Sequence, residues 1–333
     1  MIVMTNARLI RVWREIDRRP WPIFLIAVVI FVLLPWFLSD FQRIFVAEIY
    51  VWGLFAMSFA IVYGFGGMLS FAQAVFFGAG CYGFNLGTFY FGFNTWGAVI
   101  CAVIAAVGLA APIGLIATRA RSHHFLIVTV IFSVLVHSIL SSGHWRWIAG
   151  PYVTRSLTFV PEVPLGFVTL SFQSEVVVYY FTLAIVGLTL GLCTLLVSSP
   201  FGRALLAQRD NEMRASLIGL NVILLRLIVF VIAAGVAGLS GALYALLARY
   251  TNLEFFHWSY SGLAVVMAMI GGVHSLIGPF VGTAIYMLAA EHLSRYFESF
   301  VIFVGILLVI VVRYAPMGVW GVVQLLQRES RAT

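Results

Sequence analysis

Long runs of apolar residues alternate with short polar segments along the whole chain. About 20 apolar residues in a helix cross the hydrocarbon of a bilayer, whereas a membrane barrel needs strands of alternating polarity. The runs here are continuous and rich in Leu, Ile, Ala and Phe. They predict an all-α, polytopic transmembrane bundle of about ten segments, some of them interrupted. The predicted segments cover residues 23–38, 44–63, 74–91, 96–117, 125–142, 176–197, 227–247, 261–270, 279–290 and 299–312.

Two of the interruptions share a spacing. Gly66, Gly67 and Ser70 follow the second apolar run, and Gly271, Gly272 and Ser275 follow the eighth. Interrupted helices in corresponding halves of a transporter often line its substrate site. Because the chain holds 30 glycines, chance explains the match as well as an internal duplication does.

Four polar residues beside these breaks or inside a span are candidates for lining a substrate path. Freed backbone groups and half-helix ends at such breaks can meet a zwitterionic solute. For His137, a hydrogen bond to a neighbouring helix is an equally good explanation. The candidates are Ser70, Gln73, His137 and Ser275.

Charge orients the predicted bundle. All 19 basic residues other than histidine are arginine, and they cluster between apolar runs, where the positive-inside rule places cytoplasmic loops. We therefore expect a basic amphipathic cytoplasmic segment at 1–22, a transmembrane domain at 23–313 with an outer loop at 143–175, and a cytoplasmic tail at 314–333. Both termini are then cytoplasmic, in a bacterial inner membrane.

Composition excludes several functions. Hydrophobic residues make up 62% of the chain and charged residues 9%, too few to coat a soluble domain. The formal charge of +7 lacks the basic aromatic face of a nucleic-acid binder. Without lysine there is no Walker A loop, and no nucleophile or metal motif is present. We expect no catalytic residue, no metal and no cofactor in this chain.

Glycine pairs four residues apart predict close helix packing. They are Gly83 and Gly87, Gly187 and Gly191, and Gly278 and Gly282.

The segment at 199–221 is polar and lies between two apolar runs. Ser199 as N-cap and Pro200 at the first helical position predict the start of a short amphipathic helix. Asp210 and Arg214 have the spacing of an ion pair, and Gly219 suits the helix end. Such a helix can press into a groove of a soluble partner, or it is a solvated connector.

Four blocks of sequence carry a resemblance to a known family. In order, they are Gly66-Gly67-Met-Leu-Ser70-Phe-Ala-Gln73-Ala74, Ser199-Pro200-Phe201-Gly202-Arg203-Ala-Leu-Leu-Ala-Gln-Arg209-Asp210-Asn211-Glu212, Gly241-Ala242-Leu243-Tyr244, and Gly271-Gly272-x-x-Ser275-x-x-Gly278-Pro279-x-x-Gly282. On these blocks, residues 64–320 resemble the permease subunits of ABC importers of the branched-chain amino-acid type (LivM/LivH family). The loop at 147–155 departs from the family's T-G-G-x-x-G pattern, which puts contacts there in doubt.

The resemblance implies partners and an energy source. They are a homologous second permease, two cytoplasmic ATPase subunits that hold ATP and Mg²⁺, and an extracytoplasmic solute-binding protein. It also implies that segment 199–221 couples the chain to an ATPase, through Arg203, Leu205, Arg209, Asp210, Asn211, Glu212, Ala215 and Gly219. Branched-chain or related amino acids are the implied solute, with urea, amides and small organic acids as alternatives. A stand-alone secondary transporter or channel is the rival function, although few charged residues lie inside the spans.

Overall fold

The computed structural model describes residues 31–120, 122–142, 144 and 174–295, with short stretches between 154 and 172 and between 302 and 321. The basic segment at 1–22, most of the first and last predicted spans, and most of the tail at 314–333 lie outside the described residues.

Helices dominate the described part of the chain. They are η1 (Leu34–Trp36), α3 (Asp40–Ala60), the π-helical turn η2 (Ile61–Phe65), α4 (Gln73–Phe91), α5 (Thr95–Ala117), α6 (Ser122–Ser141), α8 (Glu175–Ser198), α9 (Pro200–Asp210), α10 (Glu212–Leu217), α11 (Val222–Ala248), η3 (Leu253–Phe256), α12 (Trp258–Gly271) and α13 (Gly278–Leu293). Two short antiparallel strand pairs accompany them: β1 (Thr154–Ser156) with β4 (Tyr250–Asn252), and β2 (Val163–Leu165) with β3 (Val168–Leu170). The all-α prediction is confirmed, and eight predicted spans, the second to the ninth, coincide with helices.

Five helical stretches are long and apolar enough to cross a bilayer. They cover Asp40–Phe65, Thr95–Ala117, His124–Ser141, Glu175–Ser198 and Val222–Ala248. The chain is therefore a multi-pass helical membrane protein. Of the other bundle helices, α12 has 14 residues and α13 has 16, both shorter than these five stretches, whereas α4 has 19.

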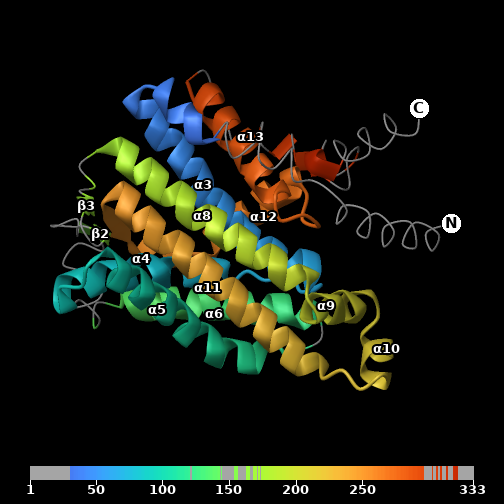
Figure 1. Ribbon diagram of the computed structural model, residues 1–333. Coiled ribbons are helices and arrows are strands. Elements are labelled where there is room, and N and C mark those ends of the chain that lie inside the picture. Colours follow the sequence, from blue (N-terminus) through green and yellow to red (C-terminus); the bar gives the residue numbers. More distant parts are fainter. Residues whose placement is uncertain are drawn as a thin grey trace, which may run out of the picture.

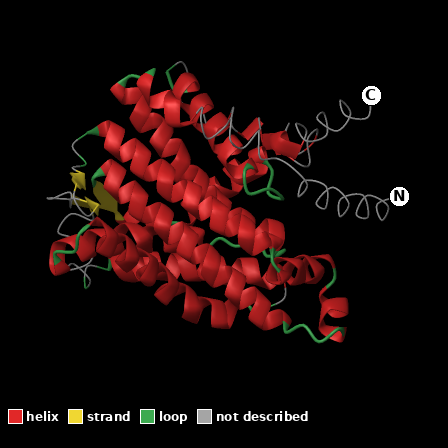
Figure 2. Ribbon diagram, in the orientation of Figure 1, coloured by secondary structure: helices red, strands yellow, loops and turns green. Residues whose placement is uncertain are grey.

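The long helices lie roughly alongside one another, with α3, α8 and α11 running across the view (Figure 1). α4 packs against α5 and α11, while α3 contacts α8, α11 and α13. The strands lie at one end of the bundle and helices α9 and α10 at the other (Figures 1 and 2). Because β1 pairs with β4, the loop before α8 meets the turn after α11 at the strand end. Residues 199–221, called the coupling segment after their predicted role, and the predicted outer loop thus lie at opposite ends (Figure 1).

The core lies where α3, α4, α11 and α12 meet. Trp52 on α3 stacks on Phe77 of α4, with ring centroids 5.3 Å apart, and meets Tyr244 of α11 edge-on at the same distance. Aromatic pairs in such geometries add stabilisation beyond the apolar area that they bury.

Glycine lets α4 and α11 approach closely. A Cβ on Gly80 would collide with the carbonyl of Gly238, and one on Gly241 with the carbonyl of Phe77. The predicted pairs give a mixed result. Gly83 lies on the backbone of α5 and Gly282 on that of α12, as expected. For Gly187 and Gly191 the prediction of close packing is wrong within the described chain, because no described atom lies within 4 Å of either added Cβ.

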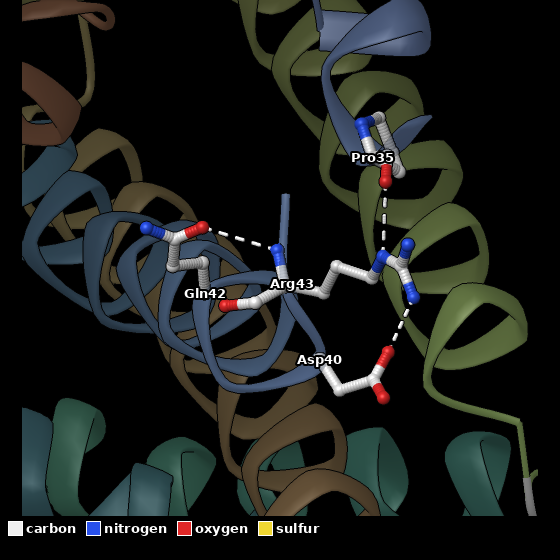
Figure 3. A network of polar contacts seen from close by, with 5 residues as sticks. Pro35, Asp40, Gln42 and Arg43 are labelled. Carbon is white, nitrogen blue, oxygen red and sulfur yellow. Dashed lines mark hydrogen bonds and ion pairs between the residues drawn. The ribbon is translucent and has the colours of Figure 1, made fainter. Parts of the chain in front are cut away.

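Residues 40–43, at the strand end of α3, lie between the first two predicted spans. The structure instead begins α3 at Asp40. Arg43 donates to the carbonyl of Pro35 at 2.9 Å and forms an ion pair with Asp40 (Figure 3). Gln42 accepts a bond from the backbone N–H of Ser39 at 3.0 Å. These contacts satisfy the first turn, so the helix starts earlier than the hydrophobic run.

Candidate substrate path and coupling site

Residues 66–72, called the crossing segment here, join η2 to α4 without helical structure. Non-helical backbone at membrane depth needs partners from neighbouring elements. The N–H of Phe71 donates to Thr129 Oγ1 at 3.1 Å, and its carbonyl accepts from both Ser133 and Ser261 at 2.7 Å. Ser261 also accepts the N–H of Ala74 at 2.9 Å. Hydroxyls from α6 and α12 thus hold the crossing segment between these two helices.

Two predicted path residues belong to this crossing. Ser70 and Gln73 are fully buried. Ser70 Oγ accepts the N–H of Ala72 at 3.2 Å, and Gln73 Oε1 accepts from Ser58 on α3, also at 3.2 Å. Gln73 Nε2 has no hydrogen-bond partner among the described residues. A buried unpaired donor costs about 1–3 kcal/mol, so the Gln73 side-chain nitrogen is available to donate a hydrogen bond to a bound solute.

The third predicted residue, His137, lies beside a histidine that sequence reasoning missed. His137 and Ser133 are one turn apart on α6, and His257 and Ser261 are one turn apart at the start of α12. The two imidazole rings meet edge-on with centroids 5.3 Å apart. His257 Nδ1 lies 2.8 Å from Ser259 Oγ and accepts the N–H of Ser259, so it caps α12.

The fourth predicted residue lies elsewhere. Ser275 is in the break between α12 and α13, and its Oγ accepts the N–H groups of Ile277 and Gly278 at 3.2 and 3.3 Å. This break lies against the end of η2, because a Cβ on Gly64 would collide with the carbonyl of Val273. The structure therefore groups Ser70, Gln73 and His137 around the crossing segment but places Ser275 at the second break.

The coupling segment is two helices rather than the single helix predicted. Ser199 caps α9 by accepting the N–H of Gly202 at 3.4 Å, as expected. The chain then breaks at Asn211, whose side chain accepts the N–H of Arg214 at 2.9 Å and caps α10. The predicted pair of Asp210 and Arg214 is wrong, since the break separates them and Asp210 pairs with Arg209 at 3.4 Å. Asparagine competes for backbone groups in this way, and that was the signal for the break.

Burial sorts the predicted coupling residues. Leu205 and Ala215 are each 2% exposed, so they pack α9 and α10 onto the chain and are unavailable as surface contacts. The large exposed apolar side chains are instead Met213, Leu217 and Ile218, which are 74%, 81% and 74% exposed. Gly219 follows α10 with a φ of 85°, the left-handed value that suits a helix end.

An ion pair holds α10 against α11. Glu212 binds Arg226 of α11 at 2.6 Å, and the side chain of Arg226 is 10% exposed. A hollow of about 370 Å³ lies between this pair and the first break; it is lined by Gly66, Gly67, Gln208, Arg209, Asp210, Asn211, Glu212, Met213 and Arg226. The coupling segment and the crossing segment are thus neighbours at this end of the bundle.

The sequence profile of one family matches residues 44–312, over most of the described bundle. Its description is "Branched-chain amino acid transport system / permease component". The chain belongs to this family.

The chain is also similar to individual curated proteins. It is 24% identical over 279 residues to the "High-affinity branched-chain amino acid transport system permease protein LivM" of Escherichia coli (strain K12), and equally to that of Salmonella typhimurium. Each alignment covers 78% of this chain and 65% of the relative. A "Probable branched-chain amino acid transport permease protein LivM" of Methanocaldococcus jannaschii is 28% identical over 142 residues, 37% of this chain and 40% of that protein. No solved structure gives a significant match.

Proposed function

We propose that the chain is a transmembrane permease subunit of an ATP-binding-cassette importer. It forms half of the path of a small polar solute, and separate ATPase subunits supply the energy. The observation that carries the proposal is the coupling segment: two capped helices at one end of the bundle expose three large apolar side chains beside the crossing segment. An apolar helix face of this kind suits a groove on a partner protein.

The proposed partners follow from the family. They are a homologous second permease, two ATPase subunits that bind ATP and Mg²⁺, and an extracytoplasmic solute-binding protein. The relatives' names support branched-chain amino acids as the solute. The surroundings of the crossing segment suit a zwitterion chemically, because Gln73 at the start of α4 offers an amide donor, and His137 on α6 and His257 at the start of α12 offer imidazoles.

The coupling role is proposed for the surface of α9 and α10. Arg203, Asp210, Asn211 and Glu212 are exposed there together with Met213, Leu217 and Ile218. Leu205, Ala215 and Gly219 support the same surface from within by packing and by ending α10. Substitution of Glu212 alone is a poor test of docking, because it also breaks the ion pair with Arg226.

Orientation is part of the proposal. About ten spans, with both termini and the coupling segment cytoplasmic in a bacterial inner membrane, give the side on which ATP is available. A topology reporter fused after Pro164 is expected to report an external position. Reporters fused after Arg209 and after Thr333 are expected to report a cytoplasmic position. An internal signal at Pro164 would reverse the assignment.

Uptake into proteoliposomes tests the function. The vesicles contain both permeases, with the ATPase subunits facing the lumen, and receive binding protein and labelled leucine from outside. They are expected to accumulate leucine only when ATP·Mg²⁺ is present in the lumen. Accumulation without the ATPase subunits, driven by a proton or sodium gradient, would assign the chain to the stand-alone transporters instead.

A further inference from the structure

Arg209 lies at the last turn of α9 and reaches back to the end of η2. Its guanidinium Nη1 donates to the carbonyl of Gly64. The backbone N–H groups that follow bond elsewhere: those of Gly67 and Met68 donate to the carbonyls of Tyr63 and Val62. The carbonyl of Gly64 is therefore one of the acceptors that a helix end leaves open, and a cation is the favoured partner there.

The methylene chain of Arg209 lies on the first break as well. A Cβ built on Gly67 would be 2.8 Å from Arg209 Cγ and 3.4 Å from Arg209 Cβ. Gly67 has a φ of 71°, a conformation that glycine adopts without strain. Only a residue without a side chain permits both this backbone turn and the close approach of Arg209.

The second break meets the same point. The carbonyl of Val273 lies on Gly64, the residue whose own carbonyl Arg209 binds. Desolvation, and then the positive charge of Arg209, lower the pKa of His274, the next residue of the second break. One side chain of the coupling segment thus contacts the end of η2 and the crossing segment directly, and acts on the second break through Gly64.

We propose that Arg209 is the positioning residue that ties α9 to both helix breaks, so that a displacement of the coupling segment moves the crossing segment with it. This inference rests on the proposed function. It assigns Arg209 to a contact inside the chain, whereas the resemblance implied a contact with the ATPase. The other arginine of α9 gives no such link in the described part of the chain: Arg203 donates to the carbonyl of Ser198 in the preceding helix, at 3.1 Å, and is exposed.

The first experiment compares Arg209→Ala with Arg119→Ala in the full reconstituted complex, since Arg119 is an exposed arginine outside segment 199–221. Arg209→Ala is expected to lower leucine uptake per ATP hydrolysed about tenfold, as the loss of a charge-assisted hydrogen bond allows. Assembly and basal ATPase activity are expected to stay near wild type. Arg119→Ala should change the ratio by about twofold or less, as other exposed substitutions do. Arg209→Lys keeps the positive charge but lacks the planar guanidinium with its several donors, so leucine uptake per ATP hydrolysed should lie between the values for alanine and arginine.

A disulfide supplies an independent test. The 3.4 Å between the two Cβ positions is close to the separation of about 3.5–4.5 Å in disulfides. The double variant Gly67→Cys with Arg209→Cys should be uncoupled when reduced and should regain coupling when oxidised, because the covalent bond replaces the tie. The two single variants, treated with the same oxidant, are the controls.

The outcomes separate the two claims. A wild-type complex without leucine-stimulated ATPase activity would sink the proposed function itself. A coupled wild type with an equally coupled Arg209→Ala, or a double variant whose coupling ignores the redox state, would overturn only the role of Arg209. A fall in assembly yield that matches the fall in uptake, with lysine no better than alanine, would also overturn it in favour of a purely structural role.

Discussion

Ser261 illustrates how single hydroxyls hold irregular backbone inside a helical bundle. It donates to the carbonyl of Phe71 and accepts the N–H of Ala74, and so it links the crossing segment to the first turn of α4. In a medium without water these groups have few other partners. One side chain of α12 therefore satisfies backbone groups on both sides of the start of α4.

Replacement of Ser261 by alanine is expected to destabilise the chain. It leaves a buried backbone N–H and one bond of a carbonyl unsatisfied, which costs about 1–3 kcal/mol. Thermal unfolding of the detergent-solubilised protein measures the loss. Ser259→Ala is the matched control, since Ser259 is exposed and its hydrogen bonds to other described side chains go to the cap residue His257 alone. Equal stability of the two variants would contradict a stabilising role for the hydrogen bonds of Ser261 with Phe71 and Ala74.

Gly241 makes a second prediction at this scale. Gly241→Val places a side chain against the carbonyl of Phe77 and forces α11 away from α4, at a cost of about 2 kcal/mol or more. Gly235→Val on the same helix is the control, because its Cβ would meet Val107 and Val103 at ordinary distances of 3.6 and 3.8 Å. The yield of monodisperse protein and its unfolding temperature should fall only for Gly241→Val. Comparable losses at both sites would mean that the close approach is unimportant.

At the scale of elements, the sequence predicted the helices well but not the helix ends. Apolar runs mark the bilayer-spanning part of a helix, whereas polar residues such as Asp40 extend it where side chains satisfy the first turn. Segment 199–221 was expected to be one helix because its charges have helical spacing, but Asn211 offers its own carbonyl oxygen to the backbone and starts a new one. The sequence signal of such a competition between a side chain and the helix is weak, and packing decides whether the helix breaks.

The surface of α10 gives the prediction for this scale. Leu217→Glu removes an exposed apolar anchor without touching the core, so the unfolding temperature should be unchanged. Loss of one interface anchor costs about 2 kcal/mol or more, or roughly 30-fold in Kd for the ATPase subunit. The affinity is measured by the amount of ATPase subunit that co-purifies with the chain as the concentration of that subunit is raised. Ser216→Glu introduces the same charge one residue away and serves as control; equal weakening by both would indicate charge repulsion rather than an apolar contact.

At the scale of the whole molecule, the sequence identified both breaks but not how they are connected. The spacing of Gly66, Gly67 and Ser70 indicated an interrupted helix, and the structure places it between α6 and α12. That His257 faces His137, and that Arg209 reaches Gly64, could not be predicted, because these contacts join residues more than one hundred positions apart. Non-local contacts follow from helix packing, and an apolar run carries no information about its neighbour.

The bundle therefore has a polar region and an apolar surface, and Arg209 lies between them. Hydroxyls, two imidazoles and the Gln73 amide, whose nitrogen has no partner among the described residues, lie around the crossing segment, while the exposed apolar face of α10 lies at the end of the bundle where Arg209 binds Gly64. In our account, solute meets the first region and the ATPase meets the second. Transport then requires that a conformational change at the ATPase contact alter the structure around the solute, and the reverse.

The most direct measurement is ATPase activity of the complete complex in proteoliposomes, with and without leucine-loaded binding protein. The account predicts stimulation that requires this chain, is weakened by Leu217→Glu through lost assembly, and is separated from uptake by Arg209→Ala. An ATPase rate that is the same with and without loaded binding protein, in vesicles that nevertheless take up leucine, would contradict the account.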